Sequence, residues 1–116
     1  TIKNFKELEI WKKGMELVKI VYIITEIFPD KEIYGLTSQI RRSAVSVPSN
    51  ISEGFKRRYS KEFKQFLNVA LGSLAELETQ LIIAKELGYL DNAKADEVID
   101  LIEDINRMTS GLIRKL

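Results

Sequence analysis

The sequence predicts an all-α protein, an antiparallel up-down-up-down four-helix bundle with a proline-kinked second helix. Apolar residues recur at helical spacing in four segments, at about residues 8–28, 36–55, 60–87 and 92–115. The connections between these segments are short, which favours antiparallel neighbours. The 116 residues, 45% hydrophobic and 30% charged, suit one globular domain that begins with an N-terminal arm at residues 1–7.

The first helix is predicted to run to Phe28, because no turn signal interrupts the chain before Pro29. One apolar stripe is expected to face the core, and it consists of Trp11, Val18, Val21, Thr25 and Phe28. A second stripe beside it consists of Ile20, Ile23 and Ile27. One stripe is enough for the core of a monomer. The second therefore predicts contact with another subunit, and the alternative is a helix buried deep within one chain.

The second helix contains Pro48 in its interior. Its expected core face consists of Leu36, Ile40, Ala44 (or Ser43), Val47 and Ile51. Proline cannot donate to the preceding turn and costs about 3 kcal/mol in an ordinary helix interior. Either the nearby serine hydroxyls offset this cost, or the helix breaks near Ser46. Gly54 is expected to end the helix.

The third helix carries the strongest periodic signal in the chain. Its apolar residues step by four and three, and they are Phe63, Leu67, Ala70, Leu74, Leu77, Leu81 and Ala84. Ser60 is the expected N-cap and Gly88 the expected C-terminal glycine. Gly72 lies inside the seam and predicts a close helix contact.

The fourth helix is expected to be capped by Asp91 or Asn92. Its core stripe consists of Val98, Ile102 (or Leu101), Ile105, Met108 (or Thr109), Leu112 and Leu116. Arg114 and Lys115 lie at its C-terminal end, where cations are favoured by the helix dipole.

The chain contains no Cys and no His. Disulfides, thiolate nucleophiles, imidazole bases and nearly all zinc or haem sites are thereby excluded. Di-iron sites in bundles use Glu-x-x-His pairs, so that site fails in its usual form. We therefore expect no enzyme, no cofactor and no metal. The absence of Cys fits a cytoplasmic protein, and the charged N-terminus argues against a signal peptide. The best apolar run, Ile20–Phe28, is too short to span a membrane and is interrupted by Glu26.

Basic residues concentrate in the first part of the chain. Residues 1–65 hold 13 Lys/Arg and 8 Asp/Glu, whereas residues 66–116 hold 5 and 9. The candidate phosphate-binding cluster consists of Arg41, Arg42, Lys56, Arg57, Arg58, Lys61 and Lys64. Phe55 and Tyr59 lie beside it and are suited to stack on an unpaired base. The alternative is a solvated loop, with Arg42 held in an ion pair.

A polar set on the second helix shares one face: Arg42, Ser46, Asn50 and Glu53. Glu76 and Gln80 of the third helix are placed to face it. Two interpretations are open, a ligand pocket and a network that fixes how the two helices pack, and we favour the network, with Arg42, Asn50 and Glu53 as its structural members.

Three stretches of the chain resemble one family. They are FKELEIWKKGMELV, YGLTSQIRRSAVSVPSNISEGFKRR and EFKQFLNVALGSLAELETQLIIAKELGYL, which together cover Phe5 to about Leu90. The sequence is identified on these motifs as a member of the 23S rRNA-intervening-sequence protein family, also called four helix bundle proteins. The resemblance implies a small bacterial bundle that assembles into a homopentameric ring. It also implies a relation to the accessory proteins of diversity-generating retroelements, which are basic pentameric barrels that bind nucleic acid and a partner reverse transcriptase.

Two functions follow as hypotheses. The first is a non-enzymatic homo-oligomer, expected to be a pentamer, that binds RNA or DNA through the basic cluster and contacts a partner protein. The second is a structural or protein-interaction ring that binds no nucleic acid. In both, the expected interface between copies contains Ile20, Ile23 and Ile27, and no membrane is involved.

Overall fold

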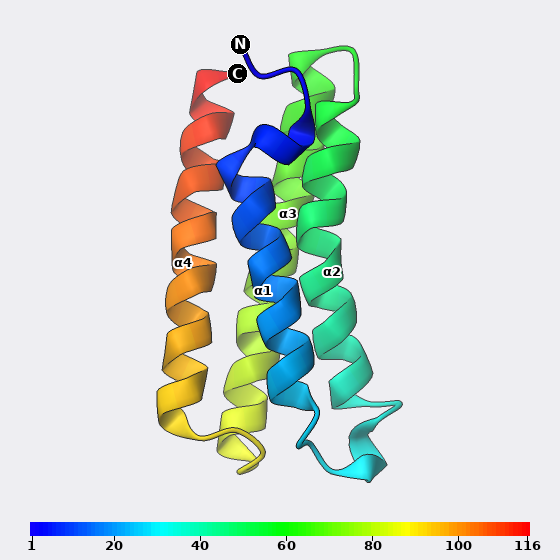
Figure 1. Ribbon diagram of the computed structural model, residues 1–116, viewed down its shortest axis with the longest axis vertical. Helices are drawn as coiled ribbons and strands as arrows, with labels where there is room; N and C mark the ends of the chain where they lie inside the picture. Colours follow the sequence, from blue (N-terminus) through cyan, green and yellow to red (C-terminus); the bar gives the residue numbers. More distant parts are fainter.

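The computed structural model describes residues 1–116 and contains helices but no strands. The helices are a short 3₁₀ turn η1 (Phe5–Glu7), α1 (Glu9–Thr25), a 3₁₀ turn η2 (Asp30–Glu32), α2 (Leu36–Phe55), α3 (Ser60–Glu86) and α4 (Asn92–Lys115). Figure 1 shows the four long helices side by side, each running opposite to the one before it. The bundle measures 44 × 24 × 19 Å. The predicted all-α four-helix bundle is confirmed.

Each helix packs against two others. α2 packs on α1 and α3, and α4 packs on α3 and α1. No close backbone approach joins α1 to α3, or α2 to α4. α1 and α3 are therefore diagonal in the bundle, so their outer faces point in opposite directions.

The core is one cluster of 20 buried apolar residues drawn from all four helices. The predicted core faces of α2 and α3 are buried except for their first members, Leu36 and Phe63, which are half-buried. The stripe predicted for α4 left Met108 and Thr109 as alternatives, and of these Thr109 is fully buried whereas Met108 is half-buried. On α1 the buried residues include Leu17 and Ile24, which the predicted stripe omitted.

The end of α1 lies three residues earlier than predicted, at Thr25 instead of Phe28. The hydroxyl of Thr25 donates to the carbonyl of Val21 at 2.7 Å, and a turn follows. Pro29 disfavours helical angles at Phe28, so the chain leaves the helix before the proline is reached. Phe28 is nevertheless buried, as predicted.

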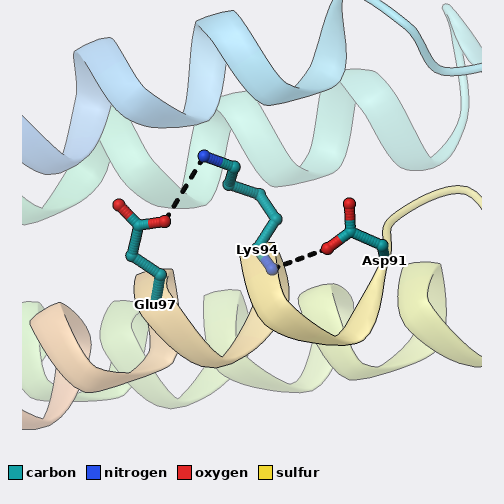
Figure 2. Close-up of polar contacts among 3 residues, drawn as sticks. All are labelled: Asp91, Lys94 and Glu97. Carbon is teal, nitrogen blue, oxygen red and sulfur yellow. Dashed lines mark hydrogen bonds and ion pairs between the residues drawn. The ribbon is translucent and has the colours of Figure 1, made fainter.

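The capping residues of α3 and α4 are those predicted, except that the N-cap of α3 lies one residue earlier. The Asp91 carboxylate accepts the Lys94 backbone N–H at 2.7 Å, and the Lys94 ammonium lies 3.3 Å from Glu97 (Figure 2). Asp91 is thus the N-cap of α4, as expected. Ser60 is the first residue of α3 and not its N-cap, which is Tyr59. Gly88 has φ +80° and ends α3 as predicted.

The other glycines correct the sequence interpretation. Gly54 lies buried inside the last turn of α2, where an added Cβ would lie 2.6 Å from the Phe66 Cβ, so it permits close packing instead of ending the helix. Gly72 has nothing within 4 Å of such a Cβ and makes no close contact. The close approach is at Gly14, whose added Cβ would lie 3.3 Å from the Pro48 Cβ. α2 stays one continuous helix through Pro48.

Candidate nucleic-acid interface and assembly faces

Charge gathers at one end of the bundle because of the up-down topology. Both chain termini and the connection between α2 and α3 lie at this end (Figure 1). When each helix is divided at its midpoint, residues 1–17, 46–73 and 104–116 fall here and hold 12 Lys/Arg and 6 Asp/Glu. Residues 18–45 and 74–103, towards the opposite end, hold 6 Lys/Arg and 11 Asp/Glu. We call these the basic end and the acidic end.

Most cations of the basic end have no acidic partner. Three are paired: Lys12 with Glu9, Arg57 with Glu53, and Arg107 with Asp104. The other nine form no ion pair, and they are Lys3, Lys6, Lys13, Lys56, Arg58, Lys61, Lys64, Arg114 and Lys115. Unpaired surface cations are available to neutralise phosphates, which is the sequence-independent part of nucleic-acid binding. The N- and C-terminal members of this set were absent from the predicted cluster.

The structure divides the predicted basic cluster into two groups. Lys56 to Lys64 lie at the basic end, whereas Arg41 and Arg42 lie near the start of α2. Fourteen residues separate Arg42 from Lys56, which is about 21 Å along a helix. Arg41 is engaged with α1: its Nε donates to the Thr25 hydroxyl at 2.9 Å and its guanidinium lies 4.6 Å from the Tyr22 ring centroid. Arg41 therefore connects two helices and is not free for phosphate.

Arg42 and Arg57 also have individual surroundings. Arg42 is exposed and forms no ion pair. It lines two open pockets, one of about 530 Å³ between α2 and α1 and one of about 510 Å³ between α2 and α3. Arg57 lies 3.5 Å from Glu53 and its guanidinium lies 4.7 Å from the centroid of the Phe66 ring. Arg57 is thus held against the surface of the basic end.

The hydrogen-bonded polar network between α2 and α3 is smaller than predicted. The Asn50 amide donates to the carbonyl and the hydroxyl of Ser46 at 2.8 and 2.9 Å. The Ser46 hydroxyl lies 2.8 Å from that of Ser73 on α3. The carbonyl that loses its backbone donor to Pro48 is that of Ala44, so the bond to Ser46 does not replace the missing one. Of the predicted polar set, Ser46 and Asn50 form these bonds, whereas Arg42 is exposed and Glu53 pairs with Arg57.

The second stripe of α1 is exposed in the single chain. Ile23 is 66% exposed and Ile27 is 77% exposed. Ile20 is half-buried and packs against the core. Ile23 lies in the last turn of α1 and Ile27 in the turn that follows it, and two large aliphatic side chains so close together and mostly in water are unusual for a surface that faces only solvent.

A second unusual face lies on α3, outside the residues that the sequence predicts to bind or to form an interface. Nine positions between residues 65 and 83 are exposed, and they are Gln65, Asn68, Val69, Gly72, Ala75, Glu76, Thr79, Ile82 and Ile83. Only one of the nine, Glu76, is charged. The outer side of a surface helix is ordinarily rich in charge. We call this set the outer face of α3. The spacing of its exposed residues was available in the sequence, but the buried heptad seam beside it dominated the pattern.

At the acidic end, a hydrogen bond joins η2 to the connection between α3 and α4. The Tyr89 hydroxyl donates to the Glu32 carboxylate at 2.9 Å, and the Leu36 backbone N–H donates to the same carboxylate at 3.1 Å. The Leu36 bond, followed by that from Tyr89, lowers the pKa of Glu32 below its ordinary 4.5. The same carboxylate raises the pKa of Tyr89 above its ordinary 10.0.

Two further observations bear on other functions. No group of three or more His, Cys, Asp or Glu side chains is arranged to hold a metal ion. By length and composition alone α3 is long and apolar enough to cross a membrane, which corrects the expectation that no segment is. A core helix of a water-soluble bundle meets the same criterion, and 39% of the most apolar window of α3 is buried in this bundle.

Four helices around one apolar core, with no strand, place the chain among the all-α four-helix bundles. The sequence profile of the family described as 23S rRNA-intervening sequence protein matches residues 6–111. The chain belongs to this family, which confirms the resemblance. The fold is similar to a crystal structure of a protein with unknown function from the S23 ribosomal protein family of Bacteroides thetaiotaomicron VPI-5482. The TM-score is 0.81 at 24% sequence identity, over 90% of this chain and 97% of that one. No curated protein matches.

Proposed function

We propose that this protein is a non-enzymatic, self-assembling cytoplasmic module whose basic end binds nucleic-acid phosphates. The observation that carries the proposal is the gathering of 12 Lys/Arg against 6 Asp/Glu at one end of the bundle. Nine of those cations are unpaired, so contact with phosphates requires no existing ion pair to break. Phosphate neutralisation releases counterions, and we expect affinity that is strong in low salt and insensitive to sequence.

Self-assembly is the second part of the proposal. The exposed Ile23 and Ile27 lie near the C-terminal end of α1, and Thr79, Ile82 and Ile83 lie towards the C-terminal end of α3. These two helices run in the same direction and end at the same end of the bundle (Figure 1). Because the two faces point in opposite directions at the same level, one copy can dock its α1 on the outer face of α3 of the next. Such a head-to-tail contact closes into a ring when it also rotates each copy relative to the last, and the family resemblance implies five copies.

A ring about an axis parallel to the helices places every basic end on the same side. Cyclic symmetry repeats the same orientation, so the nine unpaired cations of one chain recur around the ring. Several weak phosphate contacts then act together, and avidity exceeds the affinity of one subunit. The two parts of the proposal therefore support each other.

Nucleic-acid binding is tested by comparing two charge reversals of equal size. Lys61→Glu acts at the basic end and Lys31→Glu at the acidic end. Lys61 lies in the first turn of α3, where glutamate is favoured by the helix dipole, so the variant should fold. We expect Lys61→Glu to weaken binding of a labelled oligonucleotide and to reduce the slope of log affinity against log salt by about 1 or more. Lys31→Glu should leave both unchanged. Equal effects of the two variants, or no binding by the wild type in low salt, would refute the proposal.

Assembly is tested by light scattering of the purified protein. A subunit mass of 13.3 kDa gives about 67 kDa for five copies. Ile23→Asp should reduce the mass while the far-UV circular dichroism stays helical. Ile2→Asp is the matched control, because Ile2 is 47% exposed but lies outside both apolar faces. A wild-type mass for Ile23→Asp would show that α1 does not form the contact.

A protein-interaction ring without nucleic-acid binding is the second candidate. The observation that favours it is the nearly uncharged outer face of α3, which is suited to a protein surface and not to phosphates. If nuclease-treated protein keeps its oligomeric mass and retains no oligonucleotide in low salt, this second function replaces the first.

A further inference from the structure

A small pocket lies at the basic end where the N-terminal arm meets the last turn of α2. It measures about 230 Å³ and is lined by Lys3, Asn4, Phe5, Lys6, Phe55 and Lys56. The arm reaches this place because η1 packs against both α1 and α2. The sequence predicts an arm at residues 1–7 but indicates no binding site in it.

The two aromatic rings that line the pocket are each supported by another aromatic ring. The centroid of the Phe5 ring lies 5.4 Å from that of Trp11, with the planes inclined at 62°. The centroid of the Phe55 ring lies 5.9 Å from that of Phe63, with the planes at 89°. Both lining rings are half-buried. Edge-to-face contacts of this kind hold a ring in position while leaving part of its surface free.

The charged residues that line the pocket are all lysines, and none of them is paired. Lys3, Lys6 and Lys56 are exposed, and none forms an ion pair. The Asn4 side chain accepts the backbone N–H of Lys6 at 2.9 Å and so fixes the turn of the arm. The arm also contains one carboxylate, that of Glu7, which accepts the backbone N–H of Lys3 at 3.4 Å. Three unpaired lysines and two aromatic rings therefore line the same pocket.

We propose that this pocket holds one unpaired nucleotide of a single-stranded nucleic acid, with its base against Phe5 or Phe55 and its phosphates near the three lysines. This inference rests on the proposed function and names the form of nucleic acid that the basic end prefers. Pockets for small molecules usually measure about 300–1,000 Å³, so this smaller one suits a single base. The bases of a duplex are stacked and offer no free face, whereas an unpaired base stacks on any aromatic ring.

Trp11 makes the pocket observable, because it is the only tryptophan in the chain and it touches Phe5 from behind. A short oligo(dT) strand, its duplex with oligo(dA), and free thymidine monophosphate are titrated into the purified protein in low salt. We expect the single strand to change the Trp11 emission and to bind at least fivefold tighter than the duplex. The free nucleotide should bind much more weakly than the strand, because it lacks the neighbouring phosphates.

Phe5→Leu separates stacking from charge, because leucine keeps an apolar side chain but has no π-face. Stacking of one base corresponds to about fivefold or more in affinity. Phe5→Leu should therefore weaken binding of the single strand by at least about fivefold and leave binding of the duplex unchanged. Tyr34→Leu is the matched control, because Tyr34 is an aromatic residue 95% exposed at the acidic end, and it should change neither affinity.

Lys6→Ala tests the same pocket through its charge. Its effect should appear as a reduction of about 1 in the slope of log affinity against log salt for the strand. If the wild type binds strand and duplex equally and Phe5→Leu changes nothing, the pocket proposal is wrong while phosphate binding by the basic end stands. Free nucleotide binding as tightly as the strand would also overturn it. If no form of nucleic acid binds in low salt, the proposed function itself fails.

Discussion

Two glycines with opposite surroundings show how much a single Cβ decides in this bundle. An added Cβ at Gly54 would lie 2.6 Å from the Phe66 Cβ and 3.0 Å from the Phe63 Cδ1, atoms that are held by α3. One at Gly72 would meet nothing within 4 Å. We expect Gly54→Ala to lower the free energy of unfolding by about 1–3 kcal/mol through overpacking. Gly72→Ala should raise it by about 0.5–1 kcal/mol, because glycine is unfavourable inside a helix. Urea unfolding of both variants measures the difference, and equal effects would contradict the packing of α2 on α3.

A pair of threonines allows the same comparison for a hydroxyl group. The Thr109 hydroxyl is buried without a hydrogen-bond partner, whereas that of Thr25 donates to Val21 and accepts from Arg41. Thr109→Val removes an unsatisfied polar group at equal volume, so it should stabilise the protein by about 1–2 kcal/mol. Thr25→Val should destabilise it, because a buried carbonyl and Arg41 both lose a partner. Thermal melts of the two variants that move in the same direction would be inconsistent with this assignment.

The role of a particular glycine or threonine was beyond sequence reasoning for a physical reason. Gly72 interrupts a heptad seam and Gly54 precedes a basic loop, so local pattern favoured a close contact at the first and a helix end at the second. What distinguishes them is the distance to side chains on another helix, which spacing along one helix does not contain. Met108 and Thr109 both fit the spacing of the α4 stripe, because they follow Ile105 by three and four residues and precede Leu112 by four and three.

At the scale of elements, periodicity determined what could be predicted. The core faces of α2 and α3 follow from steps of three and four residues, since burial repeats with the helical turn. The early end of α1 at Thr25 leaves no periodic signal, because apolar residues continue at helical spacing through Phe28. The pocket at the basic end was missed because it is made by residues 3–6 and 55–56, which only the packing of η1 brings together.

The contact between η2 and the α3–α4 connection should depend on pH. The pKa of Glu32 is lowered in the folded state, so the stabilisation is present above the ordinary value of 4.5 and is lost as the pH falls through the lower folded value. The pKa of Tyr89 is raised, so its contribution is present below the ordinary 10.0 and is lost as the pH rises through the higher folded value. Between these limits the bond should be intact.

Glu32→Gln isolates this contribution from that of the other carboxylates. The melting temperature of the wild type should exceed that of Glu32→Gln at neutral pH, and the gap should narrow below pH 4.5. Tyr89→Phe should reduce the same gap, because the two residues share one hydrogen bond. A gap that stays constant from neutral to acidic pH would show that the ionised carboxylate of Glu32 is not what stabilises the contact.

At the scale of the whole molecule, the topology changes what the charge pattern means. Along the sequence the balance is +5 for residues 1–65 and −4 for residues 66–116. The fold regroups these charges: it brings the two termini and the α2–α3 connection together and separates them from the acidic residues of α3 and α4. The basic end was therefore predictable only in part. Lys56 to Lys64 could be found as a local cluster, whereas Lys3, Lys6, Arg114 and Lys115 join them only through the up-down arrangement.

The proposed ring makes a prediction about salt. Parallel copies place like ends side by side across a bundle that is 24 × 19 Å in section. The Debye length is about 30 Å at 0.01 M salt and about 8 Å at 0.15 M, so this repulsion acts in low salt and is screened at the higher concentration. We expect the oligomeric fraction to increase as salt is raised over this range. Antiparallel copies would instead pair basic with acidic ends, and salt would weaken their contact. A decrease of the mass measured by light scattering as salt is raised would therefore exclude the parallel ring.

The position of the two chain termini has a practical consequence. Residue 1 and residue 116 both lie at the end of the bundle where the unpaired cations gather (Figure 1). A polyhistidine tag or a fluorescent protein fused at either terminus would therefore stand over the surface proposed to meet nucleic acid. A label inserted in the connection between α1 and α2, at the far end of the bundle, would leave that surface open.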